Sequence, residues 1–221
     1  MNSLAATAIP APISWQLGEH VAIVGDTGTG KTYLTAKLVE ARRYVVMLAL
    51  KDDPVLKMFH GFTKAQRADK MEDVKLERIL LKPRYERQAF EAADALERVW
   101  RHGNWTVVID ELWYAERLGL SPWIERLLTQ GRSKNISVIA GMQRPAFVSR
   151  FAISQCTHLF SFRLDRRDAK TIRDATTEQL LPAVDSLQGK DFAYYHRARR
   201  LVTTGNANTL DELIRIPPSD D

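Results

Sequence analysis

The sequence has a single cysteine, no long apolar run and no repeated or low-complexity segment. With Cys156 alone the chain cannot form an internal disulfide, so we expect a reducing compartment, the cytoplasm. No apolar run reaches the length of about 18 residues that a membrane-spanning helix needs, and we predict no membrane span. The first residues lack a basic start followed by a compact apolar core, so we also predict no signal peptide.

The apolar fraction of 45% and charged fraction of 27% are ordinary, and 221 residues suffice for one substantial domain with a hydrophobic core. Lys and Arg outnumber Asp and Glu by 32 to 27, which gives a net charge of +5. This excess points towards a polyanionic partner such as nucleic acid, but weakly, because basic residues mostly solvate protein surfaces.

Short apolar runs alternate with segments of helical periodicity along most of the chain. We predict strands at residues 20–25, 44–50, 76–82, 105–109, 136–140 and 158–162, and a hairpin at 191–205. We predict helices at residues 31–42, 85–103, 122–130 and 146–151, and helix mixed with loops at 55–75. The alternation is typical of an α/β fold with a mainly parallel sheet covered by helices on both faces.

The domain organisation that we expect is one domain, residues 18–205, between an N-terminal arm and a C-terminal tail. Two prolines, Pro10 and Pro12, discourage helix in the arm, residues 1–17. The tail, residues 206–221, ends in IRIPPSDD, which we expect to be frayed.

One motif follows the first predicted strand and opens the first predicted helix. It matches the full pattern G-x-x-x-x-G-K-[ST], as Gly25-Asp26-Thr27-Gly28-Thr29-Gly30-Lys31-Thr32. The glycines let backbone N–H groups turn towards a phosphate, and the helix N-terminus adds positive potential. We expect Lys31 to reach the β- and γ-phosphates and the Thr32 hydroxyl to ligate Mg²⁺. The plain alternative is a tight glycine turn between a strand and a helix.

Two carboxylates, Asp110 and Glu111, directly follow the apolar strand 105–109. Ligands of open α/β sheets bind at the carboxyl edge, where these side chains must emerge. There Asp110 can hold the Mg²⁺ water shell, and Glu111 can orient or deprotonate an attacking water. The alternative is an acidic pair that only caps the following helix.

A glutamate directly after the Mg²⁺ aspartate resembles the RecA-like, additional-strand, catalytic-glutamate division of P-loop NTPases. That resemblance implies another strand between the P-loop strand and the acidic strand. No guanine-reading N-K-x-D motif occurs in the chain, so we expect ATP as the nucleotide.

A longer segment is more specific: GRSKNISVIAGMQRPAFVSRFAISQCTHLFSFRL, residues 131–164. It resembles the FtsK–HerA superfamily of DNA-pumping ATPases, which includes viral genome-packaging ATPases. In that superfamily an arginine-bearing helix end precedes a strand, a T-Q-R-P-like turn, a helix and a strand closing on an F-R-like pair. The matching pieces here are Arg132, residues 136–140, Met142-Gln143-Arg144-Pro145 and Phe162-Arg163. The resemblance covers roughly residues 18–175, and Met142 departs from the usual polar residue before the glutamine.

The resemblance implies roles for two further residues. Gln143 would contact the γ-phosphate or the attacking water, and its alternative is an ordinary polar residue of a turn. Arg132 maps to an arginine finger that reaches the ATP of a neighbouring subunit, which requires a ring, a hexamer or a pentamer. Its alternative is a solvated arginine at a helix end, and Arg144 and Arg163 are rival fingers.

A DNA translocase is expected to grip phosphates with positive side chains. Each candidate group also has a plain reading as a solvated surface, and Tyr194 and Tyr195 are candidates for stacking or for packing on the core. The basic candidates are Arg163, Arg166 and Arg167, then Arg197, Arg199 and Arg200, then Lys64, Arg67 and Lys70.

From the resemblance we predict an ATP-hydrolysing motor that moves double-stranded DNA into a viral capsid, docked on a portal or vertex protein. It would act in the host cytoplasm or in association with the virion. From the length of the chain we expect neither the amino-terminal barrel of HerA-type proteins nor the membrane segment and winged helix of FtsK. Two alternatives remain: an ATPase for conjugal or other DNA transfer, and a nucleotide-switched scaffold that pumps no DNA.

Overall fold

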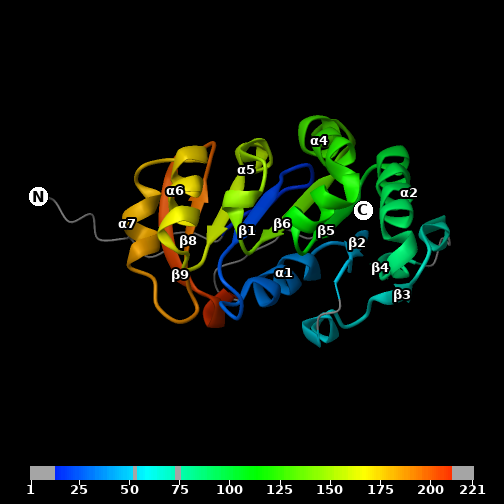
Figure 1. Ribbon diagram of the computed structural model, residues 1–221, viewed down its shortest axis with the longest axis horizontal. Coiled ribbons are helices and arrows are strands. Elements are labelled where there is room, and N and C mark those ends of the chain that lie inside the picture. Colours follow the sequence, from blue (N-terminus) through cyan, green and yellow to red (C-terminus); the bar gives the residue numbers. More distant parts are fainter. Residues whose placement is uncertain (1–12, 52–53, 73–75, 211–221) are drawn as a thin grey trace, which may run out of the picture.

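The computed structural model describes residues 13–51, 54–72 and 76–210, and within these a nine-stranded sheet carries helices on both faces (Figure 1). The strands are β1 (Val21–Val24), β2 (Val45–Leu48), β3 (Thr63–Ala65), β4 (Arg78–Leu81), β5 (Thr106–Ile109), β6 (Ser137–Met142), β7 (His158–Ser161), β8 (Asp191–His196) and β9 (Leu201–Asn206). The α-helices are α1 (Lys31–Glu40), α2 (Gln88–His102), α3 (Leu112–Ala115), α4 (Ser121–Gln130), α5 (Arg150–Gln155), α6 (Arg166–Ala175) and α7 (Leu180–Asp185). Short 3₁₀ or π turns are η1 (Pro54–Met58), η2 (Ala68–Glu72), η3 (Tyr85–Arg87), η4 (Glu116–Leu120), η5 (Gly131–Lys134), η6 (Pro145–Phe147) and η7 (Ala207–Thr209).

The strand order across the sheet is β3-β4-β2-β5-β6-β1-β7-β8-β9. Strands β3 to β7 in this order are parallel, while β8 and β9 continue the sheet as an antiparallel hairpin. Strand β6 lies between β5 and β1, so the additional strand implied by the resemblance is confirmed. The register aligns Ile109 with Ala140 and Ala140 with Ala22, so the residues that follow these three strands meet at one edge.

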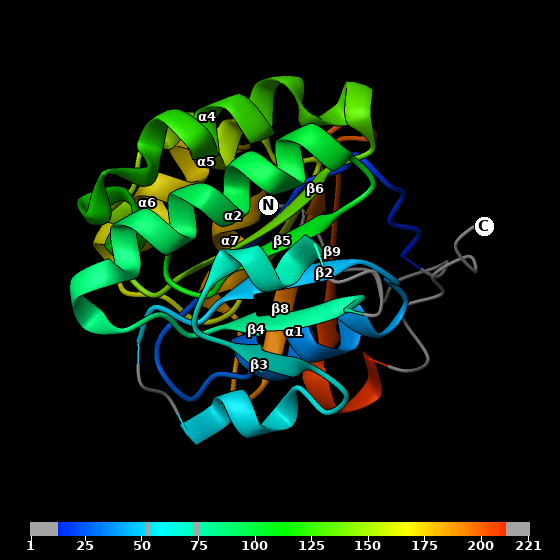
Figure 2. The same cartoon turned by 90° about the vertical axis from the view of Figure 1, so that its right-hand side faces the viewer.

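Two apolar cores lie on the two faces of the sheet (Figure 2). Helix α1 packs Leu34 and Leu38 on one face. Helices α2, α4, α5 and α6 cover the other face, and α2 buries Ala92, Ala95, Leu96 and Val99 at helical spacing. The predicted α/β architecture with both faces covered is therefore confirmed.

Helix α2 ends where the sequence predicts, at Gly103. This glycine has a φ of 69° and donates its N–H to the Val99 carbonyl. A Cβ at this position would lie 2.8 Å from the Lys134 carbonyl oxygen, so the turn needs glycine for its conformation and for space.

The packed region of the chain extends beyond residues 18–205 at both ends. Ile13 and Trp15 belong to the core on the α1 face, and the Arg42 guanidinium lies 4.0 Å from the Trp15 ring centroid. At the other end, Ala207 and Leu210 are buried in the same core. The domain boundaries stay a prediction, since residues 1–12 and 211–221, including the tail expected to fray, lie outside the described residues.

Several predicted elements need correction. The helix expected at 146–151 begins at Arg150 as α5, because η6 and an extended Val148 occupy the preceding residues. In its described part, residues 55–72, the segment expected to be helical with loops holds only 3₁₀ turns and the short edge strand β3. Helices α3, α6 and α7 were not predicted. Among the helices of the described ranges, none combines the length and apolar character that a membrane crossing requires.

Candidate functional site

The phosphate-binding motif forms a loop between β1 and α1, held by both neighbouring strands. The Gly25 N–H donates to the Met142 carbonyl at 3.1 Å, and the Asp26 N–H donates to the Arg163 carbonyl at 3.3 Å. A Cβ on Gly25 would lie 2.6 Å from the Phe162 Cβ, so only glycine allows this close approach. Gly30 caps α1 in the left-handed conformation, with φ at 115°. The loop is therefore shaped by the ends of β6 and β7 as well as by its own glycines.

The Lys31 side chain lies within the loop. It is 8% exposed, and Nζ donates to the Gly25 carbonyl at 2.7 Å and to the Asp26 carbonyl at 2.8 Å. Thr29 Oγ1 also donates to the Asp26 carbonyl, at 2.8 Å. Thr32 lies in the first turn of α1 and is partly exposed. A lysine ammonium and a helix N-terminus thus converge on one concave loop, which suits an anion.

The two carboxylates of the sequence prediction emerge beside this loop, at the end of β5. Asp110 is partly exposed, whereas Glu111 is only 9% exposed. Burial raises the pKa of Glu111 above its ordinary value, while the Lys51 ammonium and the Gln143 N–H act to lower it. A carboxylate with a raised pKa is a better proton acceptor than an exposed one, as a general base requires.

Strand β6 delivers Gln143 to the same edge. The Thr27 hydroxyl donates to Gln143 Oε1 at 3.2 Å, and the Gln143 backbone N–H lies near enough to the Glu111 carboxylate to act towards a lower pKa. Gly141 permits this arrangement, because a Cβ there would lie 2.3 Å from the Asp110 carbonyl oxygen. The structure therefore brings the phosphate-binding loop, the acidic pair and Gln143 together, as the sequence predicts.

Lys51 joins this group, although its sequence context alone did not single it out. Its Nζ lies 3.6 Å from Glu111 Oε2 and 5.6 Å from the centroid of the Tyr114 ring. With Leu56, Asp110 and Glu111, it lines a shallow cavity at the ends of β2 and β5. The signal that would have found it is its place just after an inner strand, at the same edge as Asp110.

Arg132 lies at the other edge of the sheet, in η5 before the start of β6. Arg132 is exposed and lies beside Gly18. A Cβ added to Gly18 would lie 3.2 Å from the Cγ atom of Arg132. Arg132 also faces His20, whose pKa falls to about 4 through burial and, to a smaller extent, this positive charge. Within one chain Arg132 is therefore apart from the phosphate-binding loop.

The two rival arginines occupy different positions at the loop edge. Arg144 Nη2 lies 3.1 Å from Asp165 Oδ2, and its Nε lies 2.9 Å from Oδ2 of the fully buried Asp168. Asp168 Oδ1 also accepts the Ala146 N–H at 2.8 Å, so these contacts fix the turn after Gln143 against α6. Arg163 has an exposed side chain next to Asp26.

The candidates for DNA contact divide into exposed and buried groups. The stacking role considered for Tyr194 and Tyr195 is wrong, since they are 4% and 5% exposed and belong to the core. Arg197 donates to the carbonyls of Cys156, Ile153 and Ala175, which makes it a structural residue. The exposed basic candidates are Arg163, Arg166, Arg167, Arg199, Arg200, Lys64, Arg67 and Lys70.

Comparisons with known proteins agree with this geometry. The family described as the central domain of the helicase HerA matches residues 2–42, which include β1, the phosphate-binding loop and α1. The DNA packaging ATPase P9 of Enterobacteria phage PRD1 is 30% identical over 161 residues, covering 70% of this chain and 69% of P9.

Solved structures share the fold. The genome packaging NTPase B204 of Sulfolobus turreted icosahedral virus 2 superposes with a TM-score of 0.69 at 16% identity, covering 87% of this chain and 98% of B204. B204 has also been solved in complex with AMPPCP and with ATP-gammaS. The pCW3 conjugation coupling protein TcpA gives a TM-score of 0.57 at 14% identity, covering 89% of this chain and 65% of TcpA. At these identities the structural likeness shows the fold alone.

Proposed function

This chain belongs to the family of HerA/FtsK-type P-loop ATPases that includes the packaging ATPase P9, and we propose that it hydrolyses ATP to move double-stranded DNA into a viral capsid. The observation that carries the proposal is the meeting of Lys31, Glu111 and Gln143 at one edge of the sheet. These residues supply a phosphate-binding cation, a general base and a polar contact for water or phosphate.

The residues at this edge fit Mg²⁺ and ATP. A Cβ on Gly28 would meet no atom within 4 Å, so the tip of the loop has open space around it. The Thr32 hydroxyl and the Asp110 carboxylate are hard oxygen donors, which Mg²⁺ prefers. We assign both as the metal-holding residues, with Gly25 to Thr32 cradling the phosphates. Neutralisation of phosphate charge is the chemistry that Mg²⁺ supplies when bound.

Hydrolysis needs a water activated next to the γ-phosphate. Glu111 is buried, with a raised pKa, and is suited to accept the proton of that water. Gln143 is suited to orient the water or to contact the γ-phosphate, because its side chain already lies against Thr27 of the loop. Lys31 would stabilise the charge that develops on the phosphate oxygens.

In this proposal, translocation of DNA requires several subunits. A ring, hexameric or pentameric, would bring the exposed Arg132 of one subunit to the ATP of the next, where its guanidinium would stabilise the transferring phosphoryl group. DNA phosphates would be held by exposed arginines and lysines, and the ring would dock on a portal or vertex protein of the capsid. The protein would act in the host cytoplasm or on the virion.

The test is steady-state ATP hydrolysis, measured with and without double-stranded DNA over a range of protein concentrations. We expect turnover that rises with DNA, rises again with protein concentration, and disappears in Glu111→Gln. That substitution keeps the shape of the side chain and removes its ability to take a proton. An ATP hydrolysis rate that does not change with DNA would contradict the DNA-translocating function and would favour the nucleotide-switched scaffold.

A further inference from the structure

Lys51 follows strand β2 and places a positive charge at the edge of the sheet where Glu111 and Gln143 lie. The proposed reaction gives this lysine no role. Strands β2 and β5 are adjacent and parallel, with Leu48 aligned to Ile109, so the residues after them leave the sheet side by side. Lys51 and Glu111 then meet, with 3.6 Å between Nζ and Oε2. The Glu111 side chain is 8% exposed and that of Lys51 is 45% exposed. Among the described residues, this is the ion pair that the structure shows for Glu111.

The position of Lys51 is supported by a chain of contacts that runs from the partly exposed Lys51 to the buried Gln88. Its ammonium lies over the ring of Tyr114, whose hydroxyl donates to Gln88 Oε1 at 2.9 Å. Gln88 Nε2 in turn donates to the Leu50 carbonyl at 2.8 Å, directly before Lys51. Gln88 is itself buried, so the end of β2, the start of α2 and α3 are held together around Lys51.

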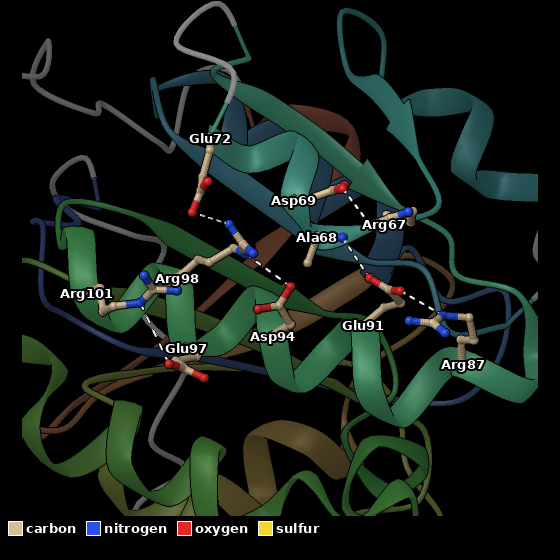
Figure 3. Close-up of polar contacts among 10 residues, drawn as sticks. All are labelled: Arg67, Ala68, Asp69, Glu72, Arg87, Glu91, Asp94, Glu97, Arg98 and Arg101. Atoms are coloured by element: carbon tan, nitrogen blue, oxygen red, sulfur yellow. Dashed lines mark hydrogen bonds and ion pairs between the residues drawn. The ribbon is translucent and has the colours of Figure 1, made fainter.

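Helix α2 is anchored firmly enough to provide this support (Figure 3). One turn after Gln88, the buried Glu91 accepts the Ala68 N–H at 2.9 Å and the Arg87 Nε–H at 2.9 Å. Further along, Arg98 contacts Asp94 on α2 and Glu72 on η2. The figure shows these pairs along one side of α2, between it and the segment that carries Arg67.

We propose that Lys51 is a positioning residue for the general base, holding the Glu111 carboxylate in the orientation that faces the attacking water. A carboxylate has two equivalent oxygens and several rotamers, and a proton acceptor must lie within hydrogen-bond reach of its water. The ion pair to Oε2 selects one of these rotamers. Lys51 touches neither substrate nor metal in this role and acts through Glu111 alone.

The inference rests on the proposed function, because a base needs positioning only if the site hydrolyses ATP. The test variant is Lys51→Met, which keeps the length of the side chain and removes its charge. We expect kcat to fall by about 10- to 100-fold, less than the loss from removing the base itself. KM and nucleotide affinity should stay unchanged, because the phosphate-binding loop is untouched.

Three further variants distinguish a positioning role of Lys51 from a purely structural role. Lys51→Arg should restore most of kcat, since a guanidinium can reach the same carboxylate. In the Glu111→Gln background, where turnover is already lost, Lys51→Met should leave nucleotide affinity and melting temperature unchanged, because Lys51 acts through Glu111. Lys57→Met removes an exposed lysine of nearby η1 and should leave all parameters at the wild-type values.

Each remaining outcome is decisive. An unchanged kcat in Lys51→Met overturns the inference and leaves the proposed ATPase intact. A fall in kcat that comes with a raised KM, a lower melting temperature and no rescue by Arg also overturns it, in favour of a structural role. A wild-type protein without any ATP hydrolysis would instead overturn the proposed function.

Discussion

Gly141 shows how one missing side chain positions the acidic pair. A Cβ at this residue would lie 2.3 Å from the Asp110 carbonyl oxygen and 3.0 Å from its carbon, both backbone atoms. Neither atom belongs to a flexible side chain, so relief would require β5 and β6 to move apart where Asp110 and Gln143 emerge. The glycine thus sets the spacing of the two strands that carry the proposed catalytic residues.

We predict that Gly141→Ala lowers the free energy of unfolding by about 1–3 kcal/mol, the usual cost of overpacking a well-packed core. It should also lower kcat, because the movement separates Glu111 from Gln143. Urea unfolding and steady-state hydrolysis measure the two effects. Gly61→Ala is the control, since its Cβ meets nothing within 4 Å and only its φ of 80° opposes the change. A Gly141→Ala protein with wild-type stability and kcat would show that the strands tolerate the extra carbon.

At the scale of elements, α6 is tied to the Gln143 turn through a buried carboxylate. Asp168 is fully buried, pairs with Arg144 and accepts the Ala146 N–H at 2.8 Å. Asp165 caps the same helix by accepting the Asp168 N–H at 2.9 Å. One helix N-terminus therefore fixes the direction in which the chain leaves Gln143.

We predict that Asp168→Asn destabilises the protein by about 1–3 kcal/mol, because it weakens buried hydrogen bonds and removes the charge facing Arg144. A lower kcat should accompany this loss, as the Gln143 turn loosens. The measurements are denaturant unfolding and hydrolysis at saturating ATP. The matched change Asp165→Asn keeps a good capping residue at an exposed site and should have a smaller effect on both. Equal effects of the two changes would contradict a special role for the buried carboxylate.

The predictability of these elements follows from how many apolar residues each one buries. Inner strands such as Val21–Val24 and Thr106–Ile109 are buried throughout and stand out as apolar runs. Helix α6 buries only Asp168, Ala169 and Ile172 among its ten residues, so its sequence shows too little apolar periodicity to predict it. Strand β3 has three residues, two of them exposed, and gives equally little signal.

The same reasoning applies to the site. The edge rule for parallel sheets places Asp110 and Glu111 at the ligand edge from sequence alone, because they follow an inner strand, whereas the role of Gln143 came from the family resemblance. The ion pairs of Arg144 were not predictable, since its partners Asp165 and Asp168 lie at the start of α6, which was not predicted. Lys51 was missed because it belongs to no recognised motif, and its pairing with Glu111 depends on the adjacency of β2 and β5.

For the whole molecule, the decisive feature is the separation of Arg132 from the phosphate-binding loop. Arg132 precedes β6 and the loop follows β1, and these strands are parallel neighbours, so the two lie at opposite edges of one sheet. An arginine at that edge can contribute to hydrolysis only if a second subunit presents its own loop to it. Head-to-tail contacts of this kind close into a ring when the rotation between subunits closes, and a ring is the assembly that we propose.

We therefore predict that Arg132→Ala and Glu111→Gln are each inactive as pure assemblies but recover activity when mixed. In a mixed ring, an Arg132→Ala subunit keeps its base and can receive the arginine of a Glu111→Gln neighbour. With equal amounts and random order, about a quarter of the interfaces regain both groups, so about a quarter of the wild-type rate should return. Arg101→Ala, which removes the exposed arginine near the end of α2, is the control and should stay active when pure. If Arg132→Ala alone hydrolyses ATP at the wild-type rate, the finger lies elsewhere, and the exposed Arg163 at the loop edge becomes the residue to mix next.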